Sequence, residues 1–482
     1  MLSKKNNLIL LFIVSLSLIT FSCSTSNDSG GEFAIAVDTD NDGIVDTLDN
    51  CQSVSNTDQL DTDDDGIGDV CDDDDDNDTI LDVNDNCPLT PNHNQADADN
   101  DGIGDVCDSS TATITKCENG MAGVYPCDNY DLISHITLSD MSATSGNDSW
   151  GWTDPTTGKE YALMGLNNGT AFIDISDPIN PIYLGKLPTA TVNSSWRDIK
   201  VYNNHAFIVS EATNHGMQVF DLTKLRNVTN PPQNFSSDVH YTNFGHAHNI
   251  VINEIIGFAY AVGSDTFNGG PHFVDIQNPL NPVAAGGYST DGESHDAQVI
   301  TYNGPDTEHI GKEIYIGSNQ DEVVIVDVTD KANPIHLSKI TYSNLAFTHQ
   351  GWITDDHQYF IVGDEIDELD FGFNTRTIIL DFTDLDNPSF KTSYSGPTSA
   401  IDHNGYVKGN LLYLANYTAG VRFIDISNIA GDVLTEVGFF DTFPNHNAAT
   451  FSGTWNVYPY FESGNIVISD IDNGLFIVKK SD

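Results

Sequence analysis

Residues 171–176 read Ala-Phe-Ile-Asp-Ile-Ser, a short apolar run that ends in an aspartate and a polar turn residue. The pattern returns about every fifty residues, at 218–222, 273–276, 324–328, 378–382 and 422–427, and a last copy without the aspartate lies at 475–478. Such β-branched and aromatic runs between Asn-Gly and Asp-Pro turns are typical of strands. Seven copies of a strand-only repeat of this length predict an all-β, seven-bladed β-propeller, because the coils of a β-solenoid are much shorter.

The strand order within a blade can be read in the second repeat. We expect its inner, second and third strands at 198–202, 206–210 and 217–221. The seventh repeat stops after its third strand, whereas residues 132–138 (LISHITL) form an unassigned strand just before the first blade. Pairing these two ends would supply the missing outer strand, close the ring and hide the sheet edges.

Ahead of the propeller, one aspartate spacing, Asp-x-Asp-x-Asp-x-x-x-Asp-x-x-Asp, occurs four times. The four ladders consist of Asp38, Asp40, Asp42, Asp46 and Asp49; Asp61, Asp63, Asp65, Asp69 and Asp72; Asp74, Asp76, Asp78, Asp82 and Asp85; and Asp97, Asp99, Asp101, Asp105 and Asp108. Five hard oxygen donors within twelve residues suit Ca²⁺, which takes roughly 6–8 oxygen ligands. Gly43, Gly66 and Gly102 occupy the sixth position, where the loop must turn sharply, and Thr79 stands there in the third ladder.

An acidic run of this kind is usually a solvated, disordered linker. The segment 38–108 holds 24 acidic residues, no Lys or Arg and no aromatic residue, so it has no apolar core of its own. Disorder does not require carboxylates at the same offsets four times, and the flanking Asn, Pro, Gln and Cys residues do not form the amphipathic helices of an EF-hand. We therefore predict that several bound calcium ions fold this segment.

The cysteines repeat with the ladders. Cys51 and Cys71 are twenty residues apart, as are Cys87 and Cys107, and both pairs bracket the same turn-rich sequence. Spacing alone leaves the connectivity open. Cys117 and Cys127 make a further pair, which leaves Cys23 as the odd one of seven.

The N-terminus predicts export. Lys4 and Lys5 precede an apolar run at 8–21 that is short for a membrane span, and Ser22-Cys23 follows. This arrangement resembles a bacterial lipoprotein signal, although an aliphatic residue is usual where Thr20 stands. The resemblance implies a signal peptide at 1–22, a lipid on Cys23 and a flexible tether at 23–37; an ordinary secretory peptide is the alternative. Paired cysteines also require an oxidising compartment.

Charge and length exclude other classes. A net charge of −53 argues against nucleic-acid partners, which need a basic surface. The 482 residues are too many for one ordinary domain. We expect the ladders at 38–108, a linker at 109–116 and the propeller at 117–482.

Two family resemblances refine this division. Asp-Asn-Cys at 49–51 and 85–87, Gly-Asp-Val-Cys-Asp at 68–72 and 104–108, and recurring Asn56, Gln59, Asn92 and Gln95 closely resemble thrombospondin type 3 repeats. Gln52 departs from the pattern, standing where Pro88 does in the second unit. The resemblance implies calcium-wrapped, disulfide-stapled extracellular modules, with Cys51 paired to Cys71 and Cys87 to Cys107.

Residues 117–478 resemble LVIVD-repeat propellers and, more closely, the choice-of-anchor B family. The resemblance lies in 119–127, 196–202, 245–249, 294–298, 348–352 and 401–404. It implies a propeller attached to a bacterial cell envelope, at the outer membrane or cell surface, and no particular reaction.

The inner strands begin with a polar ring. Aligning them places Arg197-Asp198, His248-Asn249, His295-Asp296, His349-Gln350, His403-Asn404, Trp455-Asn456 and, in blade one, Ser149-Trp150 at equivalent positions, with Glu211, His215, Asp364 and Glu365 at nearby second-strand ends. We expect His248, His295, His349, His403, Asp198 and Asp296 at one channel mouth, where they could hold a transition metal or an acidic ligand. The alternative is structural, since propellers often hydrogen-bond neighbouring blades through a recurring polar residue.

Two functional classes follow from these patterns. The first is a calcium-binding, lipid-anchored surface protein that displays a propeller for adhesion or for binding extracellular protein or carbohydrate. The second is a surface hydrolase or lyase with a metal-dependent site at the channel mouth. The sequence contains no Gly-x-Ser-x-Gly, His-Glu-x-x-His or phosphate-binding loop, which favours the non-enzymatic class.

Overall fold

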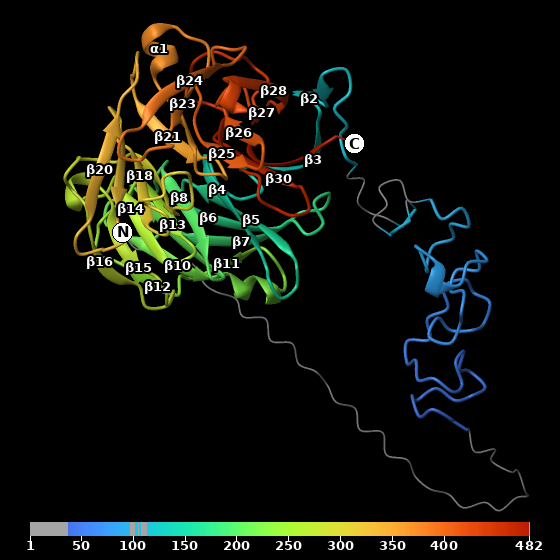
Figure 1. Cartoon of the computed structure of the whole chain (residues 1–482). Coiled ribbons are helices and arrows are strands. Elements are labelled where there is room, and N and C mark those ends of the chain that lie inside the picture. Colours follow the sequence, from blue (N-terminus) through green and yellow to red (C-terminus); the bar gives the residue numbers. More distant parts are fainter. Residues whose placement is uncertain (1–36, 97–101, 105, 108–112, 482) are drawn as a thin grey trace, which may run out of the picture. The chain divides into compact units, whose positions relative to one another are not determined.

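The computed structural model describes residues 37–96, 102–104, 106–107 and 113–481. The chain divides into two compact units, residues 1–109 and 110–482. The second unit is a seven-bladed β-propeller, as the sequence predicts (Figure 1). In the part of the chain that the structure describes, no helix has the length and apolarity needed to cross a bilayer.

Each blade is an antiparallel sheet of four successive strands from the channel outward. Blade one consists of β4 (Gly146–Thr153), β5 (Glu160–Leu166), β6 (Gly169–Asp174) and β7 (Ile182–Pro188), and blade two consists of β8 (Arg197–Tyr202), β9 (His205–Ser210), β10 (Met217–Asp221) and β12 (Val239–Tyr241). Blade three consists of β13 (Asn249–Asn253), β14 (Phe258–Val262), β15 (His272–Asp275) and β16 (Val283–Gly287). Blade four consists of β17 (Asp296–Thr301), β18 (Glu313–Ser318), β19 (Val323–Asp327) and β20 (Ile335–Ile340). The strand order expected for the second repeat is confirmed by β8, β9 and β10.

Three further blades complete the ring. Blade five consists of β21 (Thr348–Ile353), β22 (Tyr359–Asp364), β23 (Arg376–Asp381) and β24 (Ser389–Ser395). Blade six consists of β25 (Gly405–Lys408), β26 (Leu411–Ala415), β27 (Val421–Asn428) and β28 (Val433–Phe440). Blade seven consists of β29 (Thr454–Tyr458), β30 (Ile466–Asp470), β31 (Gly474–Lys480) and β3 (Tyr130–Ile136). Short strands β1 (Met121–Ala122) and β2 (Tyr125–Asp128) extend blade six, and β11 (Gln233–Asn234) extends blade one. The helical segments are α1 (Asp367–Phe371), η1 (Asp82–Asn84), η2 (Leu222–Asn227), η3 (Phe267–Gly269) and η4 (Ile429–Gly431).

The ring is closed by the N-terminal strand. Strand β3 pairs antiparallel with β31, and Leu132 lies opposite Val478. Figure 1 shows the teal β3 beside the red C-terminal strands. The innermost strands contact one another in the order β4, β8, β13, β17, β21, β25 and β29, and β29 returns to β4. Closure by residues 132–138 is therefore confirmed.

The recurring aspartate begins a turn after the third strand in the first six blades. Its Oδ1 accepts the N–H two residues later, from Ser176 to Asp174 at 3.0 Å and from Thr329 to Asp327 at 3.0 Å. The same bond forms at Asp221, Asp275, Asp381 and Asp425. Because such a side chain stabilises a turn locally, the aspartate has a structural role in every blade that carries it.

Polar side chains on the inner strands link each blade to the next. Asp148 accepts from the Ile199 N–H at 2.9 Å and Asp198 from the Ile250 N–H at 2.7 Å. Gln298 and Gln350 accept in the same way from the N–H groups of Ile353 and Gly405, at 2.8 and 2.9 Å. These bonds satisfy backbone groups that no neighbouring strand reaches at the channel.

Blade one corrects the sequence alignment. Asn147 and Asp148, rather than Ser149 and Trp150, make the bonds to blade two, because the pairing of β4 with β5 shifts register between Gly146 and Ser149. This irregularity adds residues to one strand without changing the pattern of apolar residues, so the sequence gives no sign of it.

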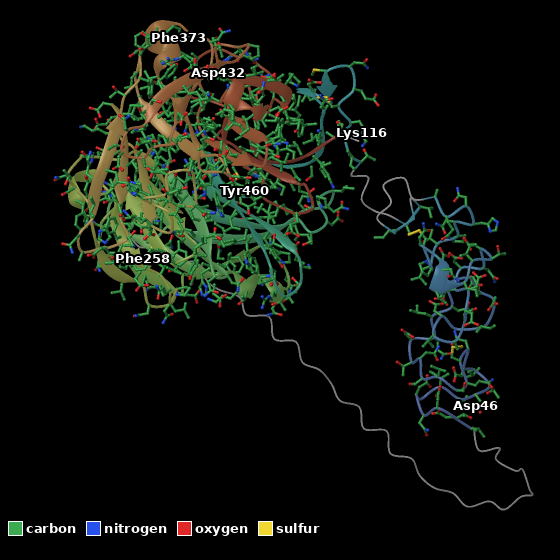
Figure 2. The ribbon with its side chains drawn as sticks, in the orientation of Figure 1. Asp46, Lys116, Phe258, Phe373, Asp432 and Tyr460 are labelled. Carbon is green, nitrogen blue, oxygen red and sulfur yellow. A yellow bond between two sulfur atoms is a disulfide. The ribbon has the colours of Figure 1, made fainter. Side chains whose placement is uncertain are left out.

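The disulfides follow the expected pairing. Cys51 is bonded to Cys71, Cys87 to Cys107 and Cys117 to Cys127 (yellow bonds in Figure 2). Cys127 lies on β2, opposite Phe440 of β28, so the third bridge ties the segment before β3 to blade six.

Ring closure makes a direct prediction about stability. Ile133 of β3 is buried in the core, whereas Ile335 of β20, the outer strand of blade four, is 57% exposed. Ile133→Asp would bury a carboxylate and should lower the unfolding free energy by roughly 3 kcal/mol or more. Ile335→Asp is the matched control and should change it by less than roughly 0.5 kcal/mol. Thermal unfolding at fixed calcium compares the two, and equal effects would contradict closure through β3.

Candidate functional site

The first three aspartates of each described ladder lie together. Their carboxylate oxygens fall within 4.8 Å of one another in three groups, Asp38/Asp40/Asp42, Asp61/Asp63/Asp65 and Asp74/Asp76/Asp78. The loop holds them by hydrogen bonds from its own backbone. Asp38, for example, accepts from the N–H groups of Asn41 at 2.8 Å and Gly43 at 3.2 Å.

The middle aspartate of each group uses only one of its oxygens. Oδ1 of Asp40, Asp63 and Asp76 accepts an N–H bond two residues later, at 3.2, 2.9 and 3.0 Å. The Oδ2 atoms of these three residues are buried and have no hydrogen-bond partner among the described residues. Burial, with neighbouring carboxylates, raises the pKa of Asp40 and Asp76. A buried carboxylate without a partner is costly, and a bound cation would remove that cost.

The sixth ladder position has a left-handed backbone in every described ladder. Its φ angle is +98° at Gly43, +94° at Gly66 and +82° at Thr79. Glycine adopts this conformation freely, whereas a β-branched residue there is strained. Thr79 thus keeps the loop geometry at an energetic cost.

Asparagine and glutamine residues that recur between the ladders bond to the ladder aspartates. Asp42 accepts from the Asn56 N–H at 2.9 Å and Asp78 from the Asn92 N–H at 2.7 Å, and Gln59 and Gln95 donate to Asp49 and Asp85. The recurring amides therefore fasten one ladder to the following turn. Asp97, Asp99, Asp101, Asp105 and Asp108 of the fourth ladder lie outside the described residues.

In the propeller, the structure brings the four predicted histidines together. His248, His295, His349 and His403 stand at the starts of the inner strands of blades three to six and line a cavity of about 430 Å³. We call this end of the channel the histidine mouth. Neighbouring rings lie 4.1, 4.5 and 4.3 Å apart between centroids, which forms a continuous row.

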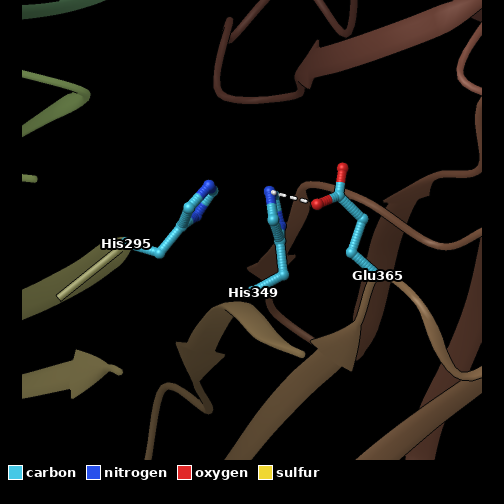
Figure 3. A group of neighbouring side chains, drawn as sticks. All are labelled: His295, His349 and Glu365. Atoms are coloured by element: carbon cyan, nitrogen blue, oxygen red, sulfur yellow. Dashed lines mark ion pairs between the residues drawn. The ribbon is translucent and has the colours of Figure 1, made fainter. Parts of the chain in front are cut away.

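A carboxylate from a second-strand end completes the row. Glu365 follows β22, and its oxygens lie 3.7 Å from Nε2 of His349 and 3.7 Å from Nε2 of His403. Figure 3 shows the His349 ring edge directed at Glu365, with His295 beside it. The Tyr417 hydroxyl donates to Glu365 at 2.6 Å and fixes its position.

The histidines differ in charge. Burial lowers the pKa of His349 and His403 to about 3, and neighbouring histidines contribute to the lowering. Burial and the other three histidines place the pKa of His295 well below its ordinary value. At His248 burial acts in the same direction, but the bond from Nδ1 to Glu211 at 2.6 Å outweighs it and raises the pKa. Three rings are thus neutral at pH 7, and His248 is the one that favours protonation.

The two predicted aspartates lie inside the channel rather than at this mouth. Asp198 is paired with Lys200 at 2.6 Å, and Lys200 also lies 3.8 Å from Asp148. Burial and the charge of Asp198 raise the pKa of Asp296 to about 7. We call Asp148, Asp198, Lys200 and Asp296 the ionic plug. His215 and Asp364 are also structural, since they bond Arg197 and the backbone of Ala346 and Phe347.

Sequence reasoning missed a second cavity, also of about 430 Å³. Trp150, Trp352, Tyr458 and Tyr460 line it, with Lys200 and Gln298 at its polar wall and the exposed carboxylates of Glu254 and Asp355 at its edge (Tyr460 is labelled in Figure 2). His349 and Trp352 both lie on β21, so the two cavities open at opposite ends of the inner strands. We call this end the aromatic mouth. The three-residue offset of Trp352 from His349 is the only sequence signal for it.

The comparisons with known proteins agree with this division. The thrombospondin type 3 repeat family matches residues 36–59 and 60–95, and the LVIVD repeat family matches residues 159–189, 310–341 and 406–442. No curated protein matches the sequence.

Solved structures are similar at the level of fold. A chain of hydrazine synthase from Kuenenia stuttgartiensis is 11% identical, with a TM-score of 0.50, over 72% of this chain and 97% of that chain. The β-propeller domain of Cps50 (Swd1) from Myceliophteria thermophila is 9% identical, with a TM-score of 0.48, over 73% of this chain and 100% of that domain. The chain therefore combines thrombospondin type 3 repeats with a β-propeller that contains LVIVD repeats.

Proposed function

We propose that this protein is a calcium-stabilised, lipid-anchored protein of the bacterial cell envelope, at the outer membrane or cell surface, whose propeller binds an extracellular carbohydrate. The observation that carries the proposal is the set of buried carboxylate oxygens without partners in three successive ladders. Calcium suits them because it accepts many oxygen ligands at flexible geometry. Membership of the choice-of-anchor B family belongs to the same proposal.

The aromatic mouth supports a binding role for the propeller. A cavity of this volume with several aromatic rings and a few polar groups is the usual form of a small-ligand site. The rings of Trp150 and Tyr458 lie 5.2 Å apart, and those of Trp352 and Tyr460 lie 6.5 Å apart, so aromatic side chains from blades one, five and seven meet at this cavity. Apolar faces beside carboxylates and amides match a sugar, which presents C–H faces and hydroxyl groups.

Calcium dependence can be tested at the sixth ladder position. A Cβ added at Gly66 meets nothing within 4 Å, so Gly66→Ala adds only backbone strain of roughly 1–2 kcal/mol. Thr79→Gly relieves such strain. We expect calcium titration calorimetry on the full chain to give about tenfold weaker binding at one site for Gly66→Ala and tighter binding for Thr79→Gly.

A matched control separates this effect from general destabilisation. Gly409, in a propeller turn, has φ +59° and also has open space around its Cβ position. Gly409→Ala should strain the chain similarly and leave calcium binding unchanged. Chelation should expand the first unit in small-angle scattering while the propeller retains its unfolding transition. A scattering profile unaffected by chelator would contradict the role of calcium.

The anchor is tested by Cys23→Ala. A lipoprotein carries a diacylglycerol on this cysteine, and more than one acyl chain is needed for stable attachment. We expect the variant to move from the membrane to the soluble fraction of a lipoprotein-processing bacterium. Cys23 lies outside the described residues. Membrane retention of the variant would refute attachment through Cys23.

Carbohydrate binding is tested at the aromatic mouth. Trp352→Ala removes one wall, and Glu254→Gln removes an exposed charge with little effect on folding. We expect the parent to retain ligands on a glycan array and both variants to lose affinity, by roughly tenfold for Trp352→Ala. Phe371→Ala, at a 46% exposed ring on α1, is the control. Retention of a protein but no glycan would overturn the carbohydrate assignment and favour a protein partner.

A further inference from the structure

We propose that His295, His349 and Glu365 form a binding site for one divalent transition-metal ion, such as Zn²⁺, at the histidine mouth, with His403 beside it. The inference is independent of the proposed function, because it concerns the opposite end of the channel from the aromatic mouth and a different kind of donor from the aspartate ladders. It rests on the spacing of the donors, on the residue types that line the cavity and on the bonds that hold the neighbouring side chains.

The donor atoms are spaced for a common ion. Ligand atoms of His295, His349 and Glu365 fall within 4.8 Å of one another, and both Nε2–Glu365 distances are 3.7 Å. Ligands at 2.0–2.2 Å from zinc lie roughly 3.3–3.6 Å apart at tetrahedral angles. The 3.7 Å between Nε2 of His349 and Glu365 is close to this spacing, and a ligand atom of His295 lies within 4.8 Å of both residues. These distances are also longer than a hydrogen bond, so the carboxylate and the rings are not simply bonded to each other.

The backbone fixes the orientation of the neighbouring His403 ring. Nδ1 of His403 donates to the Trp455 carbonyl at 2.6 Å, which fixes the ring and leaves Nε2 as the unprotonated nitrogen. A metal-binding histidine is normally oriented in this way by a bond from its other nitrogen. Tyr417 supports Glu365 from the side through its 2.6 Å bond. The site thus has both ligands and residues that position them.

The charges favour a cation over an anion. Among the residues that line the cavity, Glu365 is the one carboxylate, and no Lys or Arg is present. His349 and His403 are buried and His295 is partly buried, so these nitrogen donors are shielded from solvent. Neutral nitrogen donors with one carboxylate suit zinc, nickel, copper or iron rather than calcium. An acidic ligand would meet the negative charge of Glu365 with His248 alone to offset it.

A purely structural role accounts for the site less well. The bond from His403 to Trp455 does link blades six and seven. The His295 and His349 rings also interact with the backbone of the next blade, at His349 and His403, but their buried Nδ1 atoms make no bond as short as that of His403. The links between the same inner strands are instead made by Gln298 and Gln350.

The experiment uses the full chain held in excess Ca²⁺, which occupies the aspartate ladders, and Co²⁺ as a spectroscopic substitute for Zn²⁺. We expect about one equivalent of bound Co²⁺ by elemental analysis, with visible d–d absorption that Zn²⁺ removes. Glu365→Gln keeps the shape of the side chain and should weaken binding by roughly tenfold or more, as should His349→Ala. Tyr417→Phe should also weaken it, because Tyr417 positions Glu365.

The controls decide between sites. His309, which is 2.9 Å from Asp386 and 3.8 Å from Asp306, belongs to the other histidine–carboxylate group within the described propeller. His309→Gln should leave Co²⁺ binding unchanged. The proposal is overturned if the parent binds no Co²⁺ beyond what the ladders retain, if Glu365→Gln and His349→Ala bind as the parent does, or if His309→Gln is the variant that loses the ion.

Discussion

Both mouths of the propeller depend on the pairing of β3 with β31. Sheets in an open ring would leave exposed strand edges and an undefined channel, because the distance between neighbouring inner strands is fixed only when the ring closes. Leu132 and Val478 lie opposite each other although they belong to the two ends of the propeller sequence. The histidine row takes one residue from each of four adjacent blades, so its spacing of just over 4 Å is a property of the closed ring.

Adjacent residues at the start of an inner strand have different contacts, because side chains alternate in direction along a strand. His349 lines the cavity, and the next residue, Gln350, bonds to the following blade. This alternation makes the histidine row predictable from sequence, since equivalent positions in successive repeats must lie side by side. It also explains why Asp198 and Asp296, one residue later than the cavity position, lie in the ionic plug instead of at the mouth.

Other parts of the site could not be predicted, for identifiable physical reasons. The shift in β4 moved the blade-one position to Asn147 and Asp148 because a local irregularity changes register without changing composition. The contact of Glu365 with two histidines depends on how a turn after β22 is directed, and Tyr417 reaches it from blade six. The aromatic mouth was missed because tryptophan and tyrosine on inner strands have the same sequence pattern as core residues. Periodicity identifies which residues share a position in the ring; it does not identify which turn lies over them.

The aspartate ladders and the propeller channel differ in how their buried carboxylates are compensated. In the ladders, a backbone bond orients the middle carboxylate and leaves its second oxygen unpaired, as at Asp40, Asp63 and Asp76, which is why we propose that cations complete this segment. In the channel, Lys200 offsets Asp198, and the raised pKa of Asp296 limits further negative charge. Burial also raises the pKa of Asp148, so the Lys200–Asp198 pair carries the main charges of the ionic plug. Lys200 also lies in the wall of the aromatic mouth, so a ligand there would meet this charge network directly, whereas the residues that line the histidine mouth include no member of the ionic plug.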